Sequence, residues 1–96
     1  MKQVFIIGVG LIGGSFALDI KKRNPECVVY GIDKSEAHLD KAKTLGIIDK
    51  KATYEDLSTA DVVIVAIPVD ATLEVLSKVL DLVSDETVVF DAGSTK

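Results

Sequence analysis

Four short runs of consecutive apolar residues, rich in β-branched and aromatic side chains, divide this chain into segments long enough for helices. The runs cover residues 4–7, 28–30, 62–67 and 88–90. None of them alternates with polar residues, which is the pattern of strands covered on both faces. Such strands belong to parallel sheets, whose crossover helices pack on either side. The runs therefore predict an α/β fold.

The segment between the first two runs predicts a helix that ends near residue 23. Basic residues 21–23 place positive charge where the helix dipole favours it, and Asn24-Pro25 stops the helix. Its apolar residues recur near helical spacing, at Leu11, Ile12, Phe16 and Ile20.

A second helix is expected from about Ser35 to Leu45. Its apolar spacing predicts that Leu39, Ala42 and Leu45 are buried. Gly46 follows the last apolar residue, the position at which glycine often forms a left-handed helix cap.

A weak third strand is expected near residues 51–53, and a third helix after Pro68. Asp70 is the expected N-cap of that helix. Its buried face is expected at Leu73, Leu76, Val79, Leu80 and Val83.

Right-handed crossovers applied to this order of elements predict a doubly wound, Rossmann-like parallel sheet of five strands in the order 3-2-1-4-5. The 96 residues fit one domain, residues 1–96, because domains of ~100–150 residues are the commonest. A full dinucleotide-binding fold commonly adds a sixth strand, which is not reached before Lys96. We therefore expect the chain to be a fragment of a longer protein.

The first run leads directly into Gly8-Val9-Gly10-Leu11-Ile12-Gly13, which fits the pattern G-x-G-x-x-G. The pattern alone is weak, but here it follows a strand and opens a helix. In that context Gly8 allows the tight turn, Gly10 lets the backbone approach a pyrophosphate, and Gly13 lets helix and strand pack closely. The phosphates are expected against the N–H groups around Leu11 and Ile12, because the start of a helix favours an anion. A glycine-rich turn that binds nothing is the alternative.

Asp33 stands 20 residues after Gly13, at the end of the second run. A carboxylate at that place accepts hydrogen bonds from the adenosine ribose hydroxyls and repels a 2′-phosphate. The glycine turn and Asp33 together predict dinucleotide binding, with NAD preferred over NADP. Lys34 and Ser35 soften that preference. Asp33 also has a possible structural role, which can coexist with ribose binding, because residues 33–36 fit a capping box for the next helix.

Two further segments follow the ends of strands, and ligands bind at that edge of such sheets. Ala66 lies near the end of the third run and Pro68 directly follows that run, and both are expected beside the cofactor. Gly93 and Ser94 follow the last run, where Gly93 lets the backbone approach the nicotinamide and Ser94 hydrogen-bonds there. A plain Gly-Ser turn explains these two residues equally well.

Charge and composition narrow the classes of partner. The formal net charge of −4 has the wrong sign for a nucleic-acid surface, and no apolar stretch approaches the ~20 residues of a membrane span. One cysteine, Cys27, and one histidine, His38, do not make a zinc site, so no metal is expected. We expect Cys27 to be a buried thiol at the start of a strand, as in a cytoplasmic protein. We expect His38 to be solvated on the second helix, away from the site.

Three segments are more distinctive together than the glycine pattern alone. They are residues 8–15, residues 45–49 (Leu-Gly-Ile-Ile-Asp) and residues 91–96 (Asp-Ala-Gly-Ser-Thr-Lys). In these segments the chain resembles the prephenate and arogenate dehydrogenases, and the resemblance covers essentially its whole length. Ala92 and Thr95 stand where the family more commonly has valine.

The resemblance implies oxidative decarboxylation of prephenate to 4-hydroxyphenylpyruvate in tyrosine synthesis, with hydride passing to NAD, or the corresponding reaction of arogenate. It implies that Ser94 lies beside the nicotinamide and substrate and positions the reacting groups. The family's catalytic histidine lies downstream of the segment that matches residues 91–96, as does the helical domain that completes the pocket and forms a homodimer. We therefore expect the 96 residues to bind NAD without turning over substrate.

Two other classes of function stay open at this point. Another NAD(P)-dependent reductase, similar to the pyrroline-carboxylate reductases, shares the start of the chain, although residues 91–96 speak against it. A non-catalytic nucleotide-sensing module uses the same fold to bind without reacting.

Overall fold

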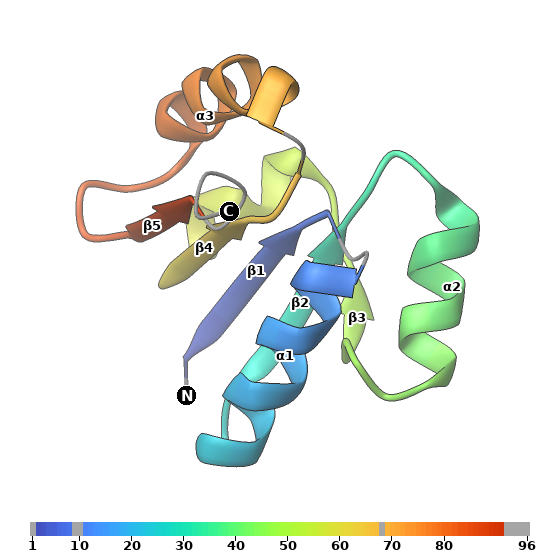
Figure 1. Ribbon diagram of the computed structural model, residues 1–96. Helices are drawn as coiled ribbons and strands as arrows, with labels where there is room; N and C mark the ends of the chain where they lie inside the picture. Colours follow the sequence, from blue (N-terminus) through green and yellow to red (C-terminus); the bar gives the residue numbers. More distant parts are fainter. Residues whose placement is uncertain (1, 9–10, 68, 92–96) are drawn as a thin grey trace.

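The computed structural model of the protein describes residues 2–8, 11–67 and 69–91, with residues 11–13, 69–73 and 91 described by their backbone alone. Its strands form one parallel sheet in the order β3-β2-β1-β4-β5, as expected from the sequence (Figure 1). The strands are β1 (Gln3–Ile7), β2 (Val28–Ile32), β3 (Lys50–Lys51), β4 (Val62–Val65) and β5 (Val88–Asp91).

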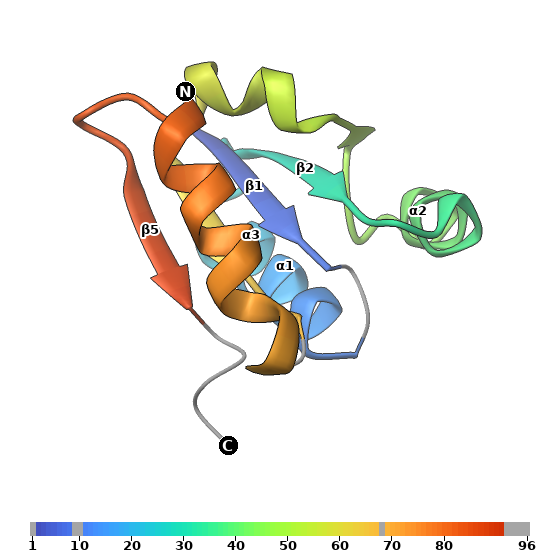
Figure 2. The same cartoon turned by 90° about the horizontal axis from the view of Figure 1, so that it is seen from above.

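Two apolar layers cover the two faces of the sheet, because successive side chains of a strand point to opposite faces. The helices are α1 (Leu11–Arg23), α2 (Glu36–Thr44), the 3₁₀ helix η1 (Tyr54–Thr59) and α3 (Val69–Leu82). One layer joins the sheet to α1 and α2 through Val4, Ile6, Ala17, Val29, Leu39, Ala42, Ile48 and Ile64. The other joins it to η1 and α3 through Phe5, Ile7, Ile32, Leu57, Val63, Val65 and Val79. Figures 1 and 2 together show the helices distributed in this way around the central strand β1.

The turn after α2 accounts for the first three residues of the Leu-Gly-Ile-Ile-Asp segment. Gly46 has a φ of +76°, which confirms the expected left-handed cap. The Ile47 N–H donates to the Ala42 carbonyl at 2.8 Å and the Gly46 N–H to the Lys43 carbonyl at 3.1 Å, so the helix ends in a Schellman motif. The expected burial of Leu45 is wrong: this residue is 61% exposed because it is the C-cap itself and not part of the packed face.

Two details of the expected helices are wrong. Helix α3 begins at Val69, so Asp70 lies inside its first turn and is not its N-cap. Val79 is fully buried whereas Leu80 is 62% exposed, because consecutive residues of a helix point ~100° apart and only one of them faces the sheet. Phe16 is 40% exposed, and Ala17 takes the buried position on α1.

The third strand is shorter than expected, and a 3₁₀ helix that the sequence did not predict follows it. Strand β3 pairs with β2 only at Lys50 and Lys51. The carboxylate of Asp56 then accepts hydrogen bonds from the Thr53 N–H at 3.0 Å and the Thr53 hydroxyl at 3.3 Å. These bonds start η1, whose Leu57 is fully buried.

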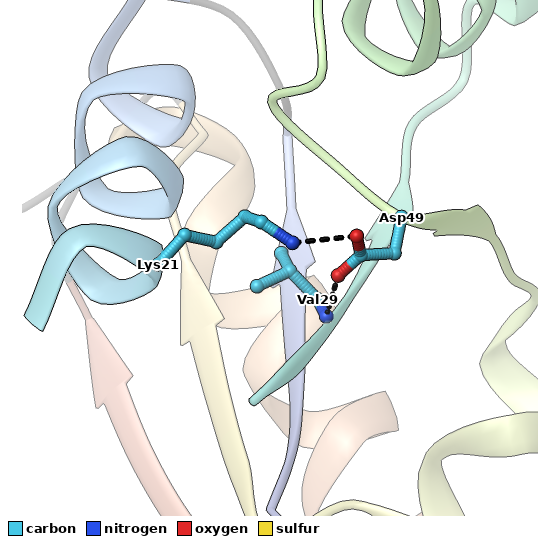
Figure 3. A network of polar contacts seen from close by, with 3 residues as sticks. All are labelled: Lys21, Val29 and Asp49. Carbon is cyan, nitrogen blue, oxygen red and sulfur yellow. Dashed lines mark hydrogen bonds and ion pairs between the residues drawn. The ribbon is translucent and has the colours of Figure 1, made fainter. Parts of the chain in front are cut away.

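Asp49 lies directly before β3 and connects this strand with α1 and β2 (Figure 3). Its carboxylate accepts hydrogen bonds from the Val29 N–H of β2 at 2.8 Å and from the Lys21 Nζ of α1 at 2.5 Å. Its own N–H donates to the Val29 carbonyl at 2.8 Å. The side chain of Asp49 therefore satisfies a β2 donor that the two-residue strand β3 does not reach.

We expect Asp49→Ala to lower the free energy of unfolding by about 1–3 kcal/mol, since a partly buried N–H loses its acceptor. Asp49→Asn keeps an acceptor for Val29 and loses only the ion pair with Lys21. That pair is partly exposed and solvent-screened, so its loss costs at most about 1 kcal/mol. Urea unfolding of the three chains at pH 7 measures both differences, and equal stability of all three would contradict this role.

The contribution of Asp49 should also depend on pH. Partial burial alone would raise the pKa of Asp49, but the Lys21 ammonium and the Val29 N–H outweigh it and lower the pKa below 3.8. A carboxylate whose pKa is lowered by folding adds stability above that value and loses it as the pH falls through the folded pKa. The difference between wild type and Asp49→Asn should therefore shrink on acidification below about pH 4–5.

Candidate nucleotide-binding site

The candidate site lies at the carboxyl edge of three adjacent strands. Ile7 of β1 is in register with Ile32 of β2 on one side and with Val65 of β4 on the other. The next residue of each strand is Gly8, Asp33 or Ala66, so all three leave the sheet at one edge. Ligands bind at this edge of doubly wound sheets, at the point where the strand order reverses.

Gly8 makes the turn out of β1, and the structure leaves no space there for a side chain. Its φ is +91°, which confirms the expected glycine turn. A Cβ at this position would lie 2.6 Å from the Ala66 carbonyl oxygen and 2.7 Å from Cγ2 of Ile67. The Gly8 N–H donates to the Ile32 carbonyl at 2.7 Å, so the turn is held against β2 as well. Gly8 thus packs the end of β1 directly against the end of β4.

Helix α1 begins three residues after Gly8, with the backbone of residues 11–13 in its first turn. The first N–H groups of a helix have no partner within it. The first turn carries no acidic residue, while Lys21, Lys22 and Arg23 lie in the last turn. The helix dipole and the absence of acidic residues from the first turn therefore suit an anion at this end, as a dinucleotide pyrophosphate requires.

Asp33 follows β2, and its largely buried carboxylate is held from the start of α2. Its Oδ1 accepts a hydrogen bond from the Ser35 N–H at 2.9 Å. Ser35 is the N-cap of α2, and its hydroxyl accepts from the His38 N–H at 3.3 Å. The structure does not show the capping box over residues 33–36 that the sequence allows as an alternative: Ser35 is the N-cap, and the Asp33 carboxylate accepts a hydrogen bond from the Ser35 N–H.

His38 lies at the site, contrary to the expectation from the sequence. Its Nδ1 is 3.6 Å from Oδ2 of Asp33. The imidazole is 60% exposed, whereas the Asp33 side chain is only 13% exposed. Helix α2 begins three residues after Asp33, and its first turn carries His38.

Tyr54 of η1 is a further residue near Asp33 that the sequence did not indicate. Burial and, after it, the negative charge of Asp33 raise the pKa of Tyr54. The ammonium of Lys78 on α3 lies 4.3 Å from the centre of the Tyr54 ring. No periodic pattern marked this residue, because η1 is a single short 3₁₀ segment.

The remaining expected site residues differ in how far the structure describes them. Ala66 is half-buried, and its N–H donates to the Ile7 carbonyl at 2.8 Å. Gly10, Pro68, Gly93 and Ser94 lie outside the described residues, so their roles stay predictions. Cys27 is a buried free thiol directly before β2, as expected.

Metal-binding clusters and membrane-spanning helices are both missing from the described part of the chain. No three side chains of His, Cys, Asp or Glu gather there to hold a metal ion. No described helix has the length and apolar character of a membrane span.

The strand order, the glycine turn and the acid after β2 define a dinucleotide-binding domain of the kind found in dehydrogenases. The family model of the prephenate dehydrogenase nucleotide-binding domain matches residues 16–96. The chain belongs to this family.

Individual proteins similar to this chain are prephenate or arogenate dehydrogenases. A prephenate dehydrogenase of Lactococcus lactis subsp. cremoris (strain MG1363) is 43% identical over 98 residues, covering 100% of this chain and 27% of the relative. The crystal structure of prephenate dehydrogenase from A. aeolicus in complex with hydroxyphenyl propionate and NAD+ is similar with a TM-score of 0.89 and 37% identity, covering 100% of this chain and 35% of that chain. The structure of Synechocystis arogenate dehydrogenase gives a TM-score of 0.87 and 26% identity, with coverage of 98% and 34%. The chain thus spans about a quarter to a third of the length of these proteins.

Proposed function

We propose that this chain is the NAD-binding domain of a prephenate dehydrogenase. The observation that carries the proposal is the placement of the Gly8 turn, the start of α1 and the Asp33 carboxylate at one sheet edge. An anion-favouring helix start next to a carboxylate matches the two polar parts of an adenine dinucleotide, its pyrophosphate and its ribose hydroxyls. The family, and the complex of the A. aeolicus enzyme with NAD+, support the same cofactor.

Each part of the site has a separate task in this proposal. The backbone of residues 11–13 binds the pyrophosphate, and Asp33 accepts hydrogen bonds from the ribose. Ala66, Pro68 and Gly93 lie along the path to the nicotinamide end, and Ser94 positions the reacting groups there. When bound, NAD supplies the acceptor for a hydride. The protein's own contribution is to bind and orient the reactants.

The substrate class follows from the names of the relatives. Prephenate is proposed because the L. lactis relative and the A. aeolicus structure are prephenate dehydrogenases. Arogenate is the alternative, since the Synechocystis structure is an arogenate dehydrogenase. With prephenate as substrate, the product of the proposed reaction is 4-hydroxyphenylpyruvate, and the protein then acts in tyrosine synthesis.

Three wider properties belong to the same proposal. Residues 1–96 act as one nucleotide-binding unit, and in the whole protein a helical domain completes the substrate pocket and forms a homodimer. The family resemblance supports both of these statements. A cytoplasmic location is proposed as well, which is compatible with the free thiol of Cys27.

The 96-residue chain should bind NAD without oxidising prephenate. A substrate hydroxyl that loses its proton as hydride leaves needs a positioned base, which is typically worth ~10²–10⁴-fold in rate. The single histidine of the chain, His38, lies beside Asp33 at the ribose end of the proposed site. The measurement is NADH absorbance with saturating prephenate and NAD, run beside a calorimetric titration with NAD. Turnover by the 96 residues, or NAD binding no tighter than that of a heat-unfolded sample, would contradict the proposal.

A chimera tests the reaction itself. We would replace the matching residues of the L. lactis enzyme by this chain, which is 43% identical to them. The chimera should oxidise prephenate, and its Ser94→Ala variant should lose at least ~10-fold in kcat with NAD affinity kept, because the reacting groups are less well oriented. Full activity of the Ser94→Ala chimera would remove Ser94 from the site.

A further inference from the structure

The contact between the His38 imidazole and Asp33 is not needed to cap helix α2. The helix is capped by the Ser35 hydroxyl, which accepts from the backbone N–H of His38 and leaves the imidazole out of the cap. The Ser35 N–H already holds Oδ1 of Asp33. The imidazole instead faces the second carboxylate oxygen, Oδ2, from 3.6 Å and is largely open to solvent.

Asp33 is the residue whose charge separates the two dinucleotides in the proposed site. NAD presents neutral ribose hydroxyls to it, whereas NADP presents a 2′-phosphate of about −1.5 to −2 charges at pH 7. A cation next to Asp33 would offset the repulsion of that phosphate and would change the binding of NAD far less. Protonation of His38 supplies such a cation.

Other ionisable groups also lie around α2. From β3, Lys51 faces the helix and pairs with Asp40 at 2.9 Å, and Asp40 and Glu36 raise the pKa of Lys51 above 10.5. From η1, Tyr54 has a pKa raised above 10.0. The acidic groups near His38 are Asp33, Glu36 and Asp40. Lys34 precedes the helix, and Lys41 lies about one turn beyond His38.

We propose that His38 is a specificity-determining residue of the adenosine site, and that the preference for NAD over NADP weakens as its imidazole becomes protonated. The proposal rests on the proposed function, because it assumes that Asp33 faces the ribose. One unit charge a few ångströms from a phosphate, at a partly solvated position, changes affinity by about threefold to tenfold. The effect should shrink at high ionic strength, because exposed charges are screened.

The phosphate of NADP titrates in the same pH range and must be separated from His38. Its second pKa is near ~6, so acid weakens the repulsion from Asp33 even without a histidine. His38→Asn keeps a polar side chain and removes the titration, so it reports the contribution of the phosphate alone. His38→Arg holds the positive charge at every pH. Thr44→Arg is the matched control, because it adds the same charge to an exposed position six residues further along α2, ~9 Å along the helix axis.

The test is the ratio of the Kd for NADP to the Kd for NAD, measured by calorimetry at pH 5.5 and pH 8.5 at about 0.15 M ionic strength, where the Debye length is about 8 Å. In wild type the ratio should fall on acidification by about threefold to tenfold more than in His38→Asn. His38→Arg should already have the low ratio at pH 8.5, and Thr44→Arg should follow wild type within about twofold, because its charge is screened from the site.

Two results would overturn the inference, and they are distinguishable from failure of the proposed function. One is a ratio that changes with pH equally in wild type and His38→Asn. The other is a His38→Arg chain that discriminates against NADP as strongly as wild type at pH 8.5. If neither dinucleotide binds at any pH, the proposed function itself is wrong and this inference falls with it.

Discussion

Asp33→Asn is expected to weaken NAD binding about 10-fold and to lower the NADP-to-NAD ratio of Kd values by about 100-fold. A hydrogen bond to a charged group contributes about 1.5–3 kcal/mol, and the amide replaces part of it when the charge is lost. The repulsion between carboxylate and 2′-phosphate disappears in the same variant, so NADP binding improves while NAD binding declines. The amide oxygen still accepts from the Ser35 N–H, so the cap of α2 is kept.

Asp40→Asn is the matched control for this experiment. Asp40 is an exposed carboxylate on α2 that pairs with Lys51, so the variant removes the same charge from a position seven residues after Asp33 and outside the proposed site. It should change neither dissociation constant by more than about twofold, because exposed charges are screened over about one Debye length. Calorimetric titration of each chain with both dinucleotides gives the four constants needed. If wild type binds NADP as tightly as NAD, and Asp33→Asn leaves both constants unchanged, the ribose role of Asp33 is wrong.

Gly8→Ala is expected to destabilise the fold severely, by about 3 kcal/mol or more, which is a large share of the 5–15 kcal/mol typical of a domain. The new methyl group would meet the Ala66 carbonyl oxygen at 2.6 Å, and a backbone oxygen held at the end of β4 has little room to move. The φ of +91° adds strain for any residue with a Cβ. Urea unfolding followed by circular dichroism measures the loss.

Gly46→Ala separates the strain of a positive φ from the steric contact with Ala66. Gly46 also has a positive φ, of +76°, but a Cβ there meets nothing within 4 Å. This variant should cost only the ~1–2 kcal/mol of a left-handed residue with a side chain. Equal losses for Gly8→Ala and Gly46→Ala would show that the contact between the ends of β1 and β4 contributes nothing.

The strands and their order were predictable because burial on both faces leaves a direct mark on the sequence. Val63 is fully buried between the two apolar layers, and the run around it contains no polar residue. Parallel strands joined by right-handed crossovers allow few orders, so four such runs and one weak strand were enough to predict the topology. The position of Gly8 and Asp33 at one edge followed from that topology.

The features that the sequence did not predict depend on contacts between elements. Thr53 and Asp56 start η1 through a local side-chain bond that leaves no periodic pattern. Leu45 and Leu80 have the spacing of buried residues, but one ends a helix and the other points away from the sheet. Periodicity predicts which residues of a helix share a face. It does not predict how far the sheet surface that covers this face extends.

His38 shows the same limitation at the candidate site. Its place on the second helix was predicted correctly, but its distance from the site was not. Helix α2 begins three residues after Asp33, and the Asp33 carboxylate accepts a hydrogen bond from the N–H of the N-cap Ser35, while His38 in the first turn lies 3.6 Å from the same carboxylate. A hydrogen bond between residues two apart is common in many loops, so the spacing alone did not indicate it.

The most direct test of the central claim is to follow the backbone amide signals of the ¹⁵N-labelled chain during titration with NAD. We predict saturable shifts at the carboxyl edge of the sheet, at Gly8, residues 11–13, Ser35 and Ala66. Amides at the opposite edge, such as Gln3, Val28 and Val62, where β1, β2 and β4 begin, should stay in place. Shifts that do not saturate, or that gather at the opposite edge, would contradict NAD binding at the site defined by Gly8 and Asp33.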